Sequence, residues 1–480
     1  MSITGAMNSA ISGLRAAALG SEVVSNNISN ALTPSYGQRS IELSSLSYNA
    51  TGGVSVDGIT RQVDESVIAD MRLASASQQN AQTAVSFFNQ LEDTTGLAND
   101  ENSLSGRLAA FEESLISAAS RPDELERLYG VVSSAQWLVD GINGAAEEIQ
   151  DMRTEADAKI ASDVETLNTA LEQVERLNIQ ITQTLSRNGN SPALYDQRQA
   201  VLDTIGSIVP INVVPRDNGA VAIYSEGGAV LLDITAAEIG FEKQNTVTAY
   251  QTLDNGNLSG LTLNGQDLRI SALDGGSLGG NFAVRDTYGV EAQTQLDALA
   301  RDLIDRFSDP SLDTTRAVGD PGLFTDLGAA FVSTDEVGIS ARLSLNTAVD
   351  PDEGGEVWRI RDGMGATSSG PAGDSSLLND LRSAMETTSV PASGGFGGGS
   401  YTSAELFSSF SASLATTRGS AEQDLTFAAA QLTETSELLL SNSVDTDQEL
   451  QNLLLIERAY AANARVIQAA NEMLEIMTGI

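Results

Sequence analysis

The sequence predicts an elongated, mainly α-helical protein with a smaller β domain. Three observations lead to this fold class. Apolar residues recur with helical spacing at both ends of the chain, a proline-free stretch from Asp123 to Ser186 keeps the same spacing, and a β-rich segment begins at residue 209. We therefore expect the terminal helices to pair as a coiled coil, a long helical bundle to form a shaft, and an antiparallel β domain to be inserted into the shaft.

Matching apolar heptads stand at the two ends of the chain. The first helix is expected to start behind Ser2 or Thr4 and to run to about Ser29. Its seam contains many small residues, Ser21 among them, so we expect the helix pair to be weakly held in one chain and to gain from neighbouring copies. The residues that we assign to an assembly interface are Ile3, Met7, Ala10, Leu14, Ala17, Val24, Asn26, Asn27, Ile28, Leu453, Ile456, Tyr460, Asn463, Ile467, Ala470, Leu474 and Met477.

Heptad spacing by itself leaves a second interpretation open. The two terminal helices could pack on each other within one chain and have no partner. The motifs at the same two ends, described below, favour assembly between copies.

Composition excludes several functional classes. The 480 residues carry a formal net charge of −39, with lysine only at Lys159 and Lys243, which would repel nucleic acid and anionic membranes. The absence of cysteine and histidine removes disulfides, thiolate catalysis, and the commonest general base and metal ligand. Residues 1–20 lack the pattern of a signal peptide, and no apolar run is long enough to span a membrane. We expect protein partners, with no nucleic acid or membrane among them.

The first half of the chain is predicted to be helical apart from one extended segment. The stretch from Asp123 to Ser186 is either one very long helix or two that nearly join, with polar residues on its outer face. The expected order is a turn at residues 33–37, strands over 41–63 around Gly52-Gly53, helical structure over 65–120 with a break near 96–102, this long helix, and a short helix that ends near 205.

The second half alternates between β and helical patterns. Strands are predicted at 211–214, 220–224, 230–232, 246–253 and 258–270, a helix at 288–307, strands near 339–345 and 356–360, a flexible connection at 391–400, and a helix at 403–441. We therefore divide the chain into a terminal coiled-coil domain (1–45 and 442–480), a helical shaft domain with some β and loop structure at 310–400 (46–208 and 284–441), and an inserted antiparallel β domain (209–283).

Several local signals have simpler interpretations than a ligand site. The glycine run 394–399 lacks the strand and the lysine of a phosphate-binding loop, so we interpret it as a linker. The acidic residues 350–356 lack the last glutamate and the helices of a calcium loop. Asp445, Asp447 and Glu449 suit the first turn of the last helix. We assign no catalytic, cofactor-binding or metal-binding residue, and we expect the protein not to be an enzyme.

Two motifs in the same order resemble those of the bacterial flagellar axial proteins, the family of rod, hook and hook–filament junction subunits. The resemblance is carried at the amino end by Ser12-Gly13-Leu14-Arg15-Ala16, Ser25-Asn26-Asn27-Ile28-Ser29-Asn30, Thr33 and Tyr36, and at the carboxyl end by residues 457–468 and Met473-Leu474. The middle of the chain, with Gly53-Val-Ser-Val56, Arg121-Pro122 and Leu194-Tyr-Asp-Gln-Arg198, is similar to the hook-associated junction members of that family.

The resemblance implies a structural subunit of the extracellular flagellum, exported by the flagellar type III apparatus without a cleaved signal. It implies a ring of copies at the junction between hook and filament, in contact with hook protein and a second junction protein. It also implies an export chaperone, for which the candidate contacts are Leu453, Ile456, Ile467 and Leu474. The alternatives are another axial protein, either a hook or a distal rod subunit, and an enzyme associated with the flagellum.

Overall fold

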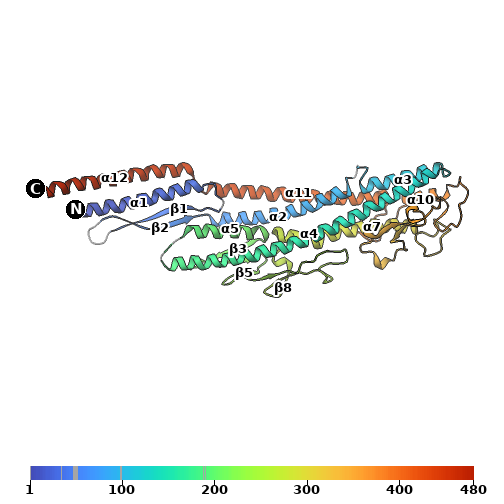
Figure 1. The fold of residues 1–480 in the computed structure, drawn as a ribbon, viewed down its shortest axis with the longest axis horizontal. Coiled ribbons are helices and arrows are strands. Elements are labelled where there is room, and N and C mark those ends of the chain that lie inside the picture. Colours follow the sequence, from blue (N-terminus) through green and yellow to red (C-terminus); the bar gives the residue numbers. More distant parts are fainter. Residues whose placement is uncertain are drawn as a thin grey trace.

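The computed structural model describes residues 2–33, 35–46, 52–97, 100–187, 189 and 191–479. The molecule is long and narrow, and its two termini lie at the same end (Figure 1). The turn expected at residues 33–37 includes Pro34, and the expected break near 96–102 includes residues 98–99, which lie outside the described residues. Within the described part of the chain, every helix is too short or too polar to serve as a membrane span.

The terminal helices α1 (Ile3–Asn30) and α12 (Thr446–Thr478) lie side by side and run in opposite directions (Figure 1). Ser2 caps α1 by accepting a hydrogen bond from the Gly5 backbone N–H. Asp445 caps α12 by accepting hydrogen bonds from the backbone N–H groups of Asp447 and Gln448. Both helices therefore begin at a satisfied cap, as the sequence predicts for α12.

A two-stranded antiparallel hairpin follows α1 and packs along it. Its strands are β1 (Gln38–Ser45) and β2 (Val54–Gln62), which lie within or close to the extended segment expected at 41–63. The hydroxyl of Ser9 donates to the Gly52 carbonyl, and the hydroxyl of Ser12 accepts from the Val54 N–H. The hairpin is thus attached to the terminal helix pair. The expected boundary between residues 45 and 46 lies between its two strands.

The shaft is a bundle of long helices. Its main members are α2 (Glu65–Thr95), α3 (Leu104–Ser120), α4 (Leu125–Ser186), α5 (Pro192–Ile208), α7 (Gly289–Ser308) and α11 (Ser403–Ser441). Helix α4 is a single helix of 62 residues, about 90 Å long, which decides between the two interpretations of the 123–186 stretch. In the half of the shaft away from the termini, the rings of Phe111, Phe307 and Phe324 form a fully buried cluster with centroids 5.2 to 6.0 Å apart.

Two small antiparallel sheets pack against α4 and α5. The first contains β3 (Ile211–Pro215), β4 (Val221–Ser225) and β5 (Val230–Leu232), and the second contains β6 (Ile239–Gly240), β7 (Leu261–Leu263) and β8 (Gln266–Leu268). Their inner faces share a hydrophobic core with Ile160, Leu167 and Ile205. A 3₁₀ turn, Ile270–Ala272, and α6 (Gly276–Ala283) follow, and a π-helical turn, Val284–Tyr288, joins α6 to α7.

The strand expected at 246–253 is wrong, because side chains of α4 hold this segment as a loop. Arg153 is fully buried and donates to the backbone carbonyls of Thr248 and Gln251, at 3.2 and 2.6 Å. The hydroxyl of Thr154 accepts from the Val247 N–H. Burial lowers the pKa of Arg153 to about 10, so the guanidinium is still charged at neutral pH. These contacts replace the backbone hydrogen bonds to a neighbouring strand that a β-strand would need.

The segment between α7 and α11 contains short elements. They are β9 (Phe324–Asp326), a 3₁₀ turn (Ser333–Asp335), α8 (Ile339–Arg342), β10 (Leu343–Leu345), a 3₁₀ turn (Pro351–Glu353), α9 (Arg359–Asp362) and α10 (Ser376–Glu386). The strand expected near 356–360 is wrong: a turn leads there into α9, because the backbone N–H groups of Arg359, Ile360 and Arg361 donate to carbonyls three residues earlier and not to a strand partner. Helix α10 was not expected from the sequence.

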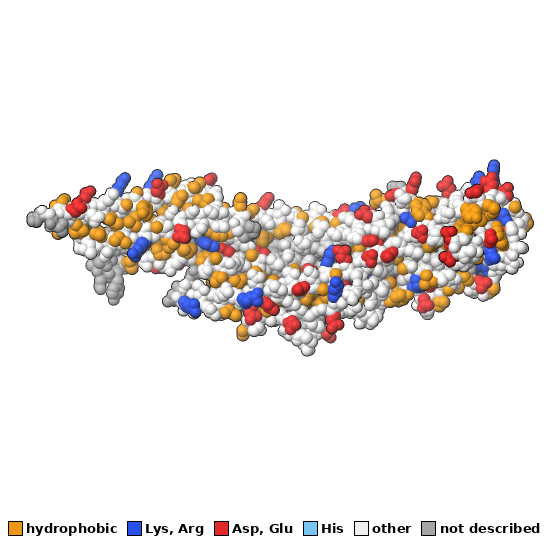
Figure 2. All heavy atoms as spheres, in the orientation of Figure 1, with side chains coloured by type: hydrophobic (Ala, Val, Ile, Leu, Met, Phe, Trp, Pro, Cys, Tyr) orange, Lys and Arg blue, Asp and Glu red, His pale blue; other side chains and the backbone are white. Residues whose placement is uncertain are grey.

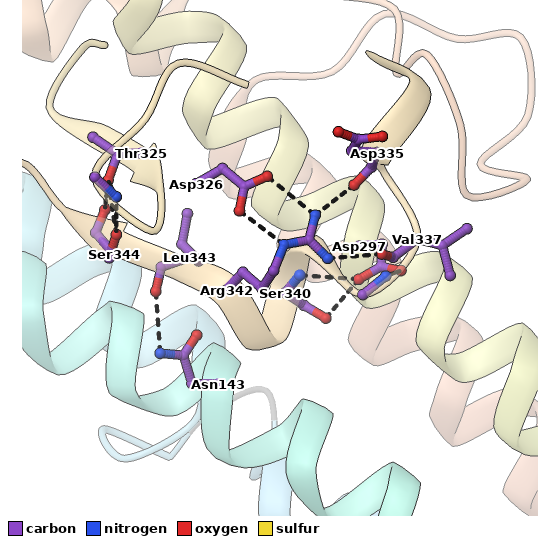
Figure 3. Close-up of polar contacts among 12 residues, drawn as sticks. Asn143, Asp297, Thr325, Asp326, Asp335, Val337, Ser340, Arg342, Leu343 and Ser344 are labelled. Atoms are coloured by element: carbon purple, nitrogen blue, oxygen red, sulfur yellow. Dashed lines mark hydrogen bonds and ion pairs between the residues drawn. The ribbon is translucent and has the colours of Figure 1, made fainter. Parts of the chain in front are cut away.

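Polar side chains hold this segment on the helices beneath it (Figure 3). Asp297 of α7 accepts from the backbone N–H and the hydroxyl of Ser340, at 3.0 and 2.6 Å. Arg342 donates to both carboxylate oxygens of Asp326, and Asn143 of α4 donates to the Leu343 carbonyl. The hairpin of β9 and β10 is therefore fixed to both α4 and α7.

The glycine-rich stretch 391–400 is held at both ends and is not a flexible connection. Ser389 and Tyr401 exchange two backbone hydrogen bonds, 2.9 and 2.8 Å long, and close the stretch into a loop. Phe396 of this loop is buried in the main core. Arg306 donates to the Tyr401 carbonyl and to the Ser389 hydroxyl. An aromatic anchor and an arginine clamp thus order a segment whose composition alone indicates a linker.

Candidate assembly interface

The α1 and α12 helices meet along a regular antiparallel seam. A Cβ atom added at Gly13 would lie 2.5 Å from the side-chain nitrogen of Asn463, and one added at Gly20 would lie 3.1 Å from Ile456. These glycines let the two helices approach closely. Three contacts follow one another at seven-residue intervals in both helices: Gly13 with Asn463, Gly20 with Ile456, and Asn27 with Glu449.

The assigned interface residues occupy three kinds of position in the subunit. Buried residues are Ala10, Ala17, Val24, Asn27 and Ala470; half-buried residues are Ile3, Met7, Leu14, Ile28, Leu453, Ile456, Asn463 and Ile467; exposed residues are Asn26, Tyr460, Leu474 and Met477. Of this set, Asn27, Ile456 and Asn463 contact the opposite terminal helix, and Asn26, Tyr460, Leu474 and Met477 remain at the surface; the role of the whole set in assembly stays a prediction.

Sequence reasoning missed two residues of the seam. It named Leu14 and Ser21 as seam positions, and the structure shows that their neighbours Gly13 and Gly20 also lie against α12. A search for apolar residues overlooks glycine. The available signal was the seven-residue spacing of Gly13, Gly20 and Asn27, three residues that allow or form close contacts.

Asn27 connects three elements near the base of the terminal helix pair. Its side chain is fully buried and donates to the Arg39 carbonyl and to Glu449, at 2.8 and 2.9 Å. Its side-chain oxygen accepts from the Tyr36 hydroxyl and from the Arg39 N–H, at 2.8 and 3.0 Å. Gln38 also donates to Glu449, which is buried as well. All four hydrogen-bonding positions of the amide are used, so Asn27 acts within the subunit.

Tyr36 lies at the edge of this cluster. Burial raises the pKa of its hydroxyl, and the nearby carboxylates of Asp196 and Glu449 act in the same direction, while Arg39 opposes them. The hydroxyl is therefore protonated at neutral pH and can donate its hydrogen bond to Asn27. The amide of Asn27, the backbone of Arg39, the Tyr36 hydroxyl and Glu449 thus form a hydrogen-bonded network at the place where both terminal helices reach the shaft.

A large apolar surface remains on α12 away from this seam. Leu455 and Ile476 are 62% and 67% exposed. Figure 2 shows apolar side chains spread over the end of the molecule that α1 and α12 form. Other large apolar residues of α12 that stay exposed are Leu450, Leu454, Tyr460, Val466, Met473 and Met477. A group of large exposed apolar side chains on one helix is typical of an interaction site.

The motif Leu194-Tyr-Asp-Gln-Arg198 lies in α5 and contacts two different parts of the fold. Asp196 accepts hydrogen bonds from the base of the β1–β2 hairpin. Arg198 is buried and donates to the side-chain oxygen of Asn178 and to the Gly219 carbonyl, at 3.0 and 2.7 Å. Burial lowers the pKa of Arg198. The motif therefore links the terminal region, α4 and the first β sheet.

The acidic clusters that the sequence contains have local structural roles. Asp350 accepts from the Asp352 N–H at 3.0 Å and caps a 3₁₀ turn, and Gly354 ends that turn with a φ of 86°. Among the described residues, no group of three or more acidic side chains is arranged to hold a metal ion. These carboxylates act on backbone N–H groups.

Two family models match the chain. The helical domain of flagellar hook-associated protein FlgK matches residues 88–322, and the carboxyl-terminal region of the flagellar basal body rod FlgEFG proteins matches residues 439–480. The second match covers the end of α11 and nearly all of α12, and the first covers most of the shaft and the inserted sheets. The two matches thus lie on the two parts of the molecule that the fold separates.

The curated relatives described next are all named flagellar hook-associated protein 1. The chain is 24% identical to flagellar hook-associated protein 1 of Escherichia coli (strain K12), over an alignment that covers 99% of each protein. It is 25% identical over 360 residues to flagellar hook-associated protein 1 of Salmonella typhimurium, where the match covers 72% of this chain and 63% of the relative. The protein of the same name from Bacillus subtilis is 26% identical over 224 residues, 44% of each chain.

Among solved structures, the flagellar hook junction protein FlgK from Burkholderia pseudomallei aligns with a TM-score of 0.43 and 20% identity, over 54% of this chain and 46% of that one. The family assignment rests on the sequence comparisons, because two family models match in order and the alignment with the Escherichia coli protein extends over nearly the whole of both chains. The chain belongs to the family of flagellar hook-associated protein 1.

Proposed function

We propose that this protein is a structural subunit of the bacterial flagellum that forms the junction ring between hook and filament. Its contacts would be copies of itself, the hook protein and a second junction protein, outside the cell, after export through the flagellar type III apparatus. The observation that carries the proposal is the exposed apolar surface of α12. This helix pairs with α1 at one end of an elongated subunit.

Burial explains why this surface favours a ring. Many residues along the seam between α1 and α12, such as Gly13, Gly20 and Asn463, are small or polar and bury little apolar area. The large side chains Leu454, Leu455 and Ile476 point elsewhere and remain in water. When several copies stand around one axis, each α12 can cover its apolar face with a neighbour, and the hydrophobic gain offsets the entropy of ordering the helices.

The proposed chaperone contact follows from the same helix. Leu453, Ile456 and Ile467 are half-buried in the folded subunit, and Ile456 lies against Gly20 of α1. A chaperone groove that takes these residues therefore competes with α1. We infer that the chaperone binds α12 before the helix pair forms and releases it for assembly.

The domain division of the sequence stays a proposal. The terminal domain would comprise residues 1–45 and 442–480, the shaft 46–208 and 284–441, and the inserted β domain 209–283. Pairing between β1 and β2 supports moving the first boundary to about residue 63, because a hairpin is a single folding unit. Limited proteolysis of the purified chain tests this: cleavage should concentrate near 442–445 and spare the hairpin.

Electron microscopy of isolated hooks tests the junction role. Hooks prepared without their junction proteins are incubated with the purified chain, or with a version that lacks residues 442–480. We expect a short cap at the distal end of the hook with the intact chain only. If the intact chain does not bind hooks, the proposal is wrong.

Point variants make the test sharper. Leu454→Glu with Ile476→Glu places two charges on the exposed face of α12 and should abolish the cap. The matched control is Val230→Glu with Leu327→Glu, which adds the same charge at two exposed apolar positions of the shaft region, in β5 and beside β9. A cap that survives the α12 variant would show that this surface does not carry assembly.

One observation favours a second candidate function, a hook or distal rod subunit. Residues 439–480 match the family model of rod FlgEFG proteins. Such a subunit would polymerise by itself into long tubes, whereas a junction subunit should stop after one ring. The lengths of the assemblies in the same micrographs distinguish the two.

A further inference from the structure

The terminal helices connect to the shaft at a joint, which we define as the region where the base of the β1–β2 hairpin meets α5. Polar side chains of α5 hold the hairpin there, and we call these contacts the latch. The chain crosses the joint at residues 63–64 and 442–445, and α1 is followed there by the β1–β2 hairpin. Helices α1 and α12 pack on each other, and α1 also packs on the β1–β2 hairpin, whose second strand reaches the shaft at α5. The direction of the terminal helices therefore depends on how the hairpin base is attached to α5.

Asp196 of α5 makes the central contact of this attachment. One of its carboxylate oxygens accepts from the Gly37 N–H at 3.0 Å and from Arg61 at 2.7 Å, and the other accepts from Arg39 at 2.8 Å. Arg39 belongs to β1 and Arg61 to β2. A single carboxylate thus binds both strands and the segment that leads into them.

Two further residues of α5 extend the contact along one helix face. Asp203 accepts from the Ser35 hydroxyl at 3.0 Å and from Arg72 of α2 at 2.7 Å. The side-chain oxygen of Gln199 accepts from Arg61. Residues 196, 199 and 203 are spaced by three and four, so they lie on one face of α5. That face contacts the hairpin base and residues 35–39.

Partial burial makes these contacts effective. The side chains of Arg61, Asp196 and Arg72 are 10%, 16% and 5% exposed. Ion pairs that are shielded from water are screened little by salt, and removal of one partner leaves the other charge poorly solvated. Gly37 is also required here, because a Cβ at this position would lie 2.5 Å from the Arg61 side chain.

Apolar packing is incomplete beside the latch. A cavity of about 340 Å³ lies between residues 31–38, the start of α2 and the end of α11, with Ile68, Met71 and Leu439 in its wall. Leu32, at its rim, is 91% exposed. Because this side of the joint is not closed by a packed core, hydrophobic contacts there do not determine one angle.

We propose that Asp196, Gln199 and Asp203 are positioning residues that latch the hairpin base to α5 and so set the direction of the paired terminal helices relative to the shaft. In a ring every copy needs the same direction, and the latch supplies it before assembly. The inference concerns the free subunit, so it can fail while the junction role stands, and the reverse also holds.

Spin-label distance measurements on the full chain test the latch. The chain contains no cysteine, so two introduced cysteines are labelled alone. Ala18→Cys in α1 with Gln173→Cys in α4 reports across the joint, and Gln173→Cys with Gln431→Cys in α11 reports within the shaft; these three positions are exposed. The variant is Asp196→Ala with Asp203→Ala, and the control is Glu124→Ala, which removes exposed ion pairs with Arg121 and Arg127.

We expect the double variant to broaden the distance distribution across the joint at least twofold and to leave the shaft distribution unchanged. Glu124→Ala should alter neither. A joint distribution as narrow as that of the parent chain would overturn the proposal. So would equal broadening of both pairs, because the residues would then hold the shaft together and would not set the direction of the terminal helices.

Discussion

Arg285 and Asp157 form an ion pair 2.7 Å long in which both side chains are completely buried. Asp157 projects from α4 and also accepts from the Gln244 N–H, while Arg285 comes from the π-helical turn between α6 and α7. The guanidinium also pairs with Asp286 and lies 4.9 Å from the ring centre of Phe282. This pair joins the long helix of the shaft to the π-helical turn that leads into α7.

The first prediction concerns this pair. Asp157→Ala leaves a buried guanidinium with one carboxylate instead of two, and we expect a loss of about 3 kcal/mol in the free energy of unfolding. Chemical denaturation followed by circular dichroism measures it. Glu155→Ala is the control, since it removes an exposed pair with Lys159 on the same helix and should change stability little. Equal effects of the two variants would contradict the argument.

The second prediction concerns two neighbouring asparagines. Asn27→Ala leaves the Tyr36 hydroxyl and the Arg39 N–H without their acceptor and removes one of the two hydrogen bonds to Glu449, and it should destabilise the terminal helix pair by at least about 2 kcal/mol. Asn26→Ala is the matched control, because Asn26 is exposed. Hydrogen exchange of α1 amides measures both, and protection of α1 should fall in the Asn27 variant alone.

The third prediction concerns glycine in the seam. In an open helix, replacing glycine with alanine stabilises by about 0.5 to 1 kcal/mol, and Gly144 of α4 has such surroundings. Gly13→Ala should gain less than this, because its Cβ would lie 2.5 Å from the side-chain nitrogen of Asn463 and displace that side chain. In an Asn463→Ala background the same change should recover the full gain. A double-mutant cycle by thermal denaturation gives the coupling, and a coupling near zero would show that the two residues do not meet.

The fourth prediction rests on the proposed function and on where the charge lies. Residues 1–45 carry two arginines and two glutamates, and residues 442–480 carry two arginines and six acidic residues, so these segments contribute only −4 of the net charge of −39. In a ring, residues 46–441 of neighbouring copies, which carry the rest of the negative charge, repel one another. Salt screens this repulsion. Cap formation on hooks should therefore strengthen between about 20 and 300 mM NaCl, and weaker caps at high salt would contradict this picture.

Much of the fold was predictable because helical periodicity is a local property. The absence of proline and the unbroken spacing in residues 123–186 indicate α4, and alternation around Gly52-Gly53 indicates the first hairpin. The errors arose where a distant side chain overrides a local pattern. Arg153 holds 246–253 as a loop, and Arg306 holds both ends of the glycine-rich stretch 391–400. Neither contact leaves a signal in the segment itself.

By itself, the sequence determined the helical ends, the long shaft helix, the inserted β segment and the family, because these depend on spacing and motifs within short stretches. Only the tertiary structure decided which face of α1 meets α12, since a heptad pattern locates a seam to within one residue and cannot rank Gly13 against Leu14. It also decided that Asn27 bonds to Glu449, 422 residues away, and that Asp196 binds Arg39 and Arg61. Such partners are selected by the packing of whole helices, which brings together residues that no local pattern relates.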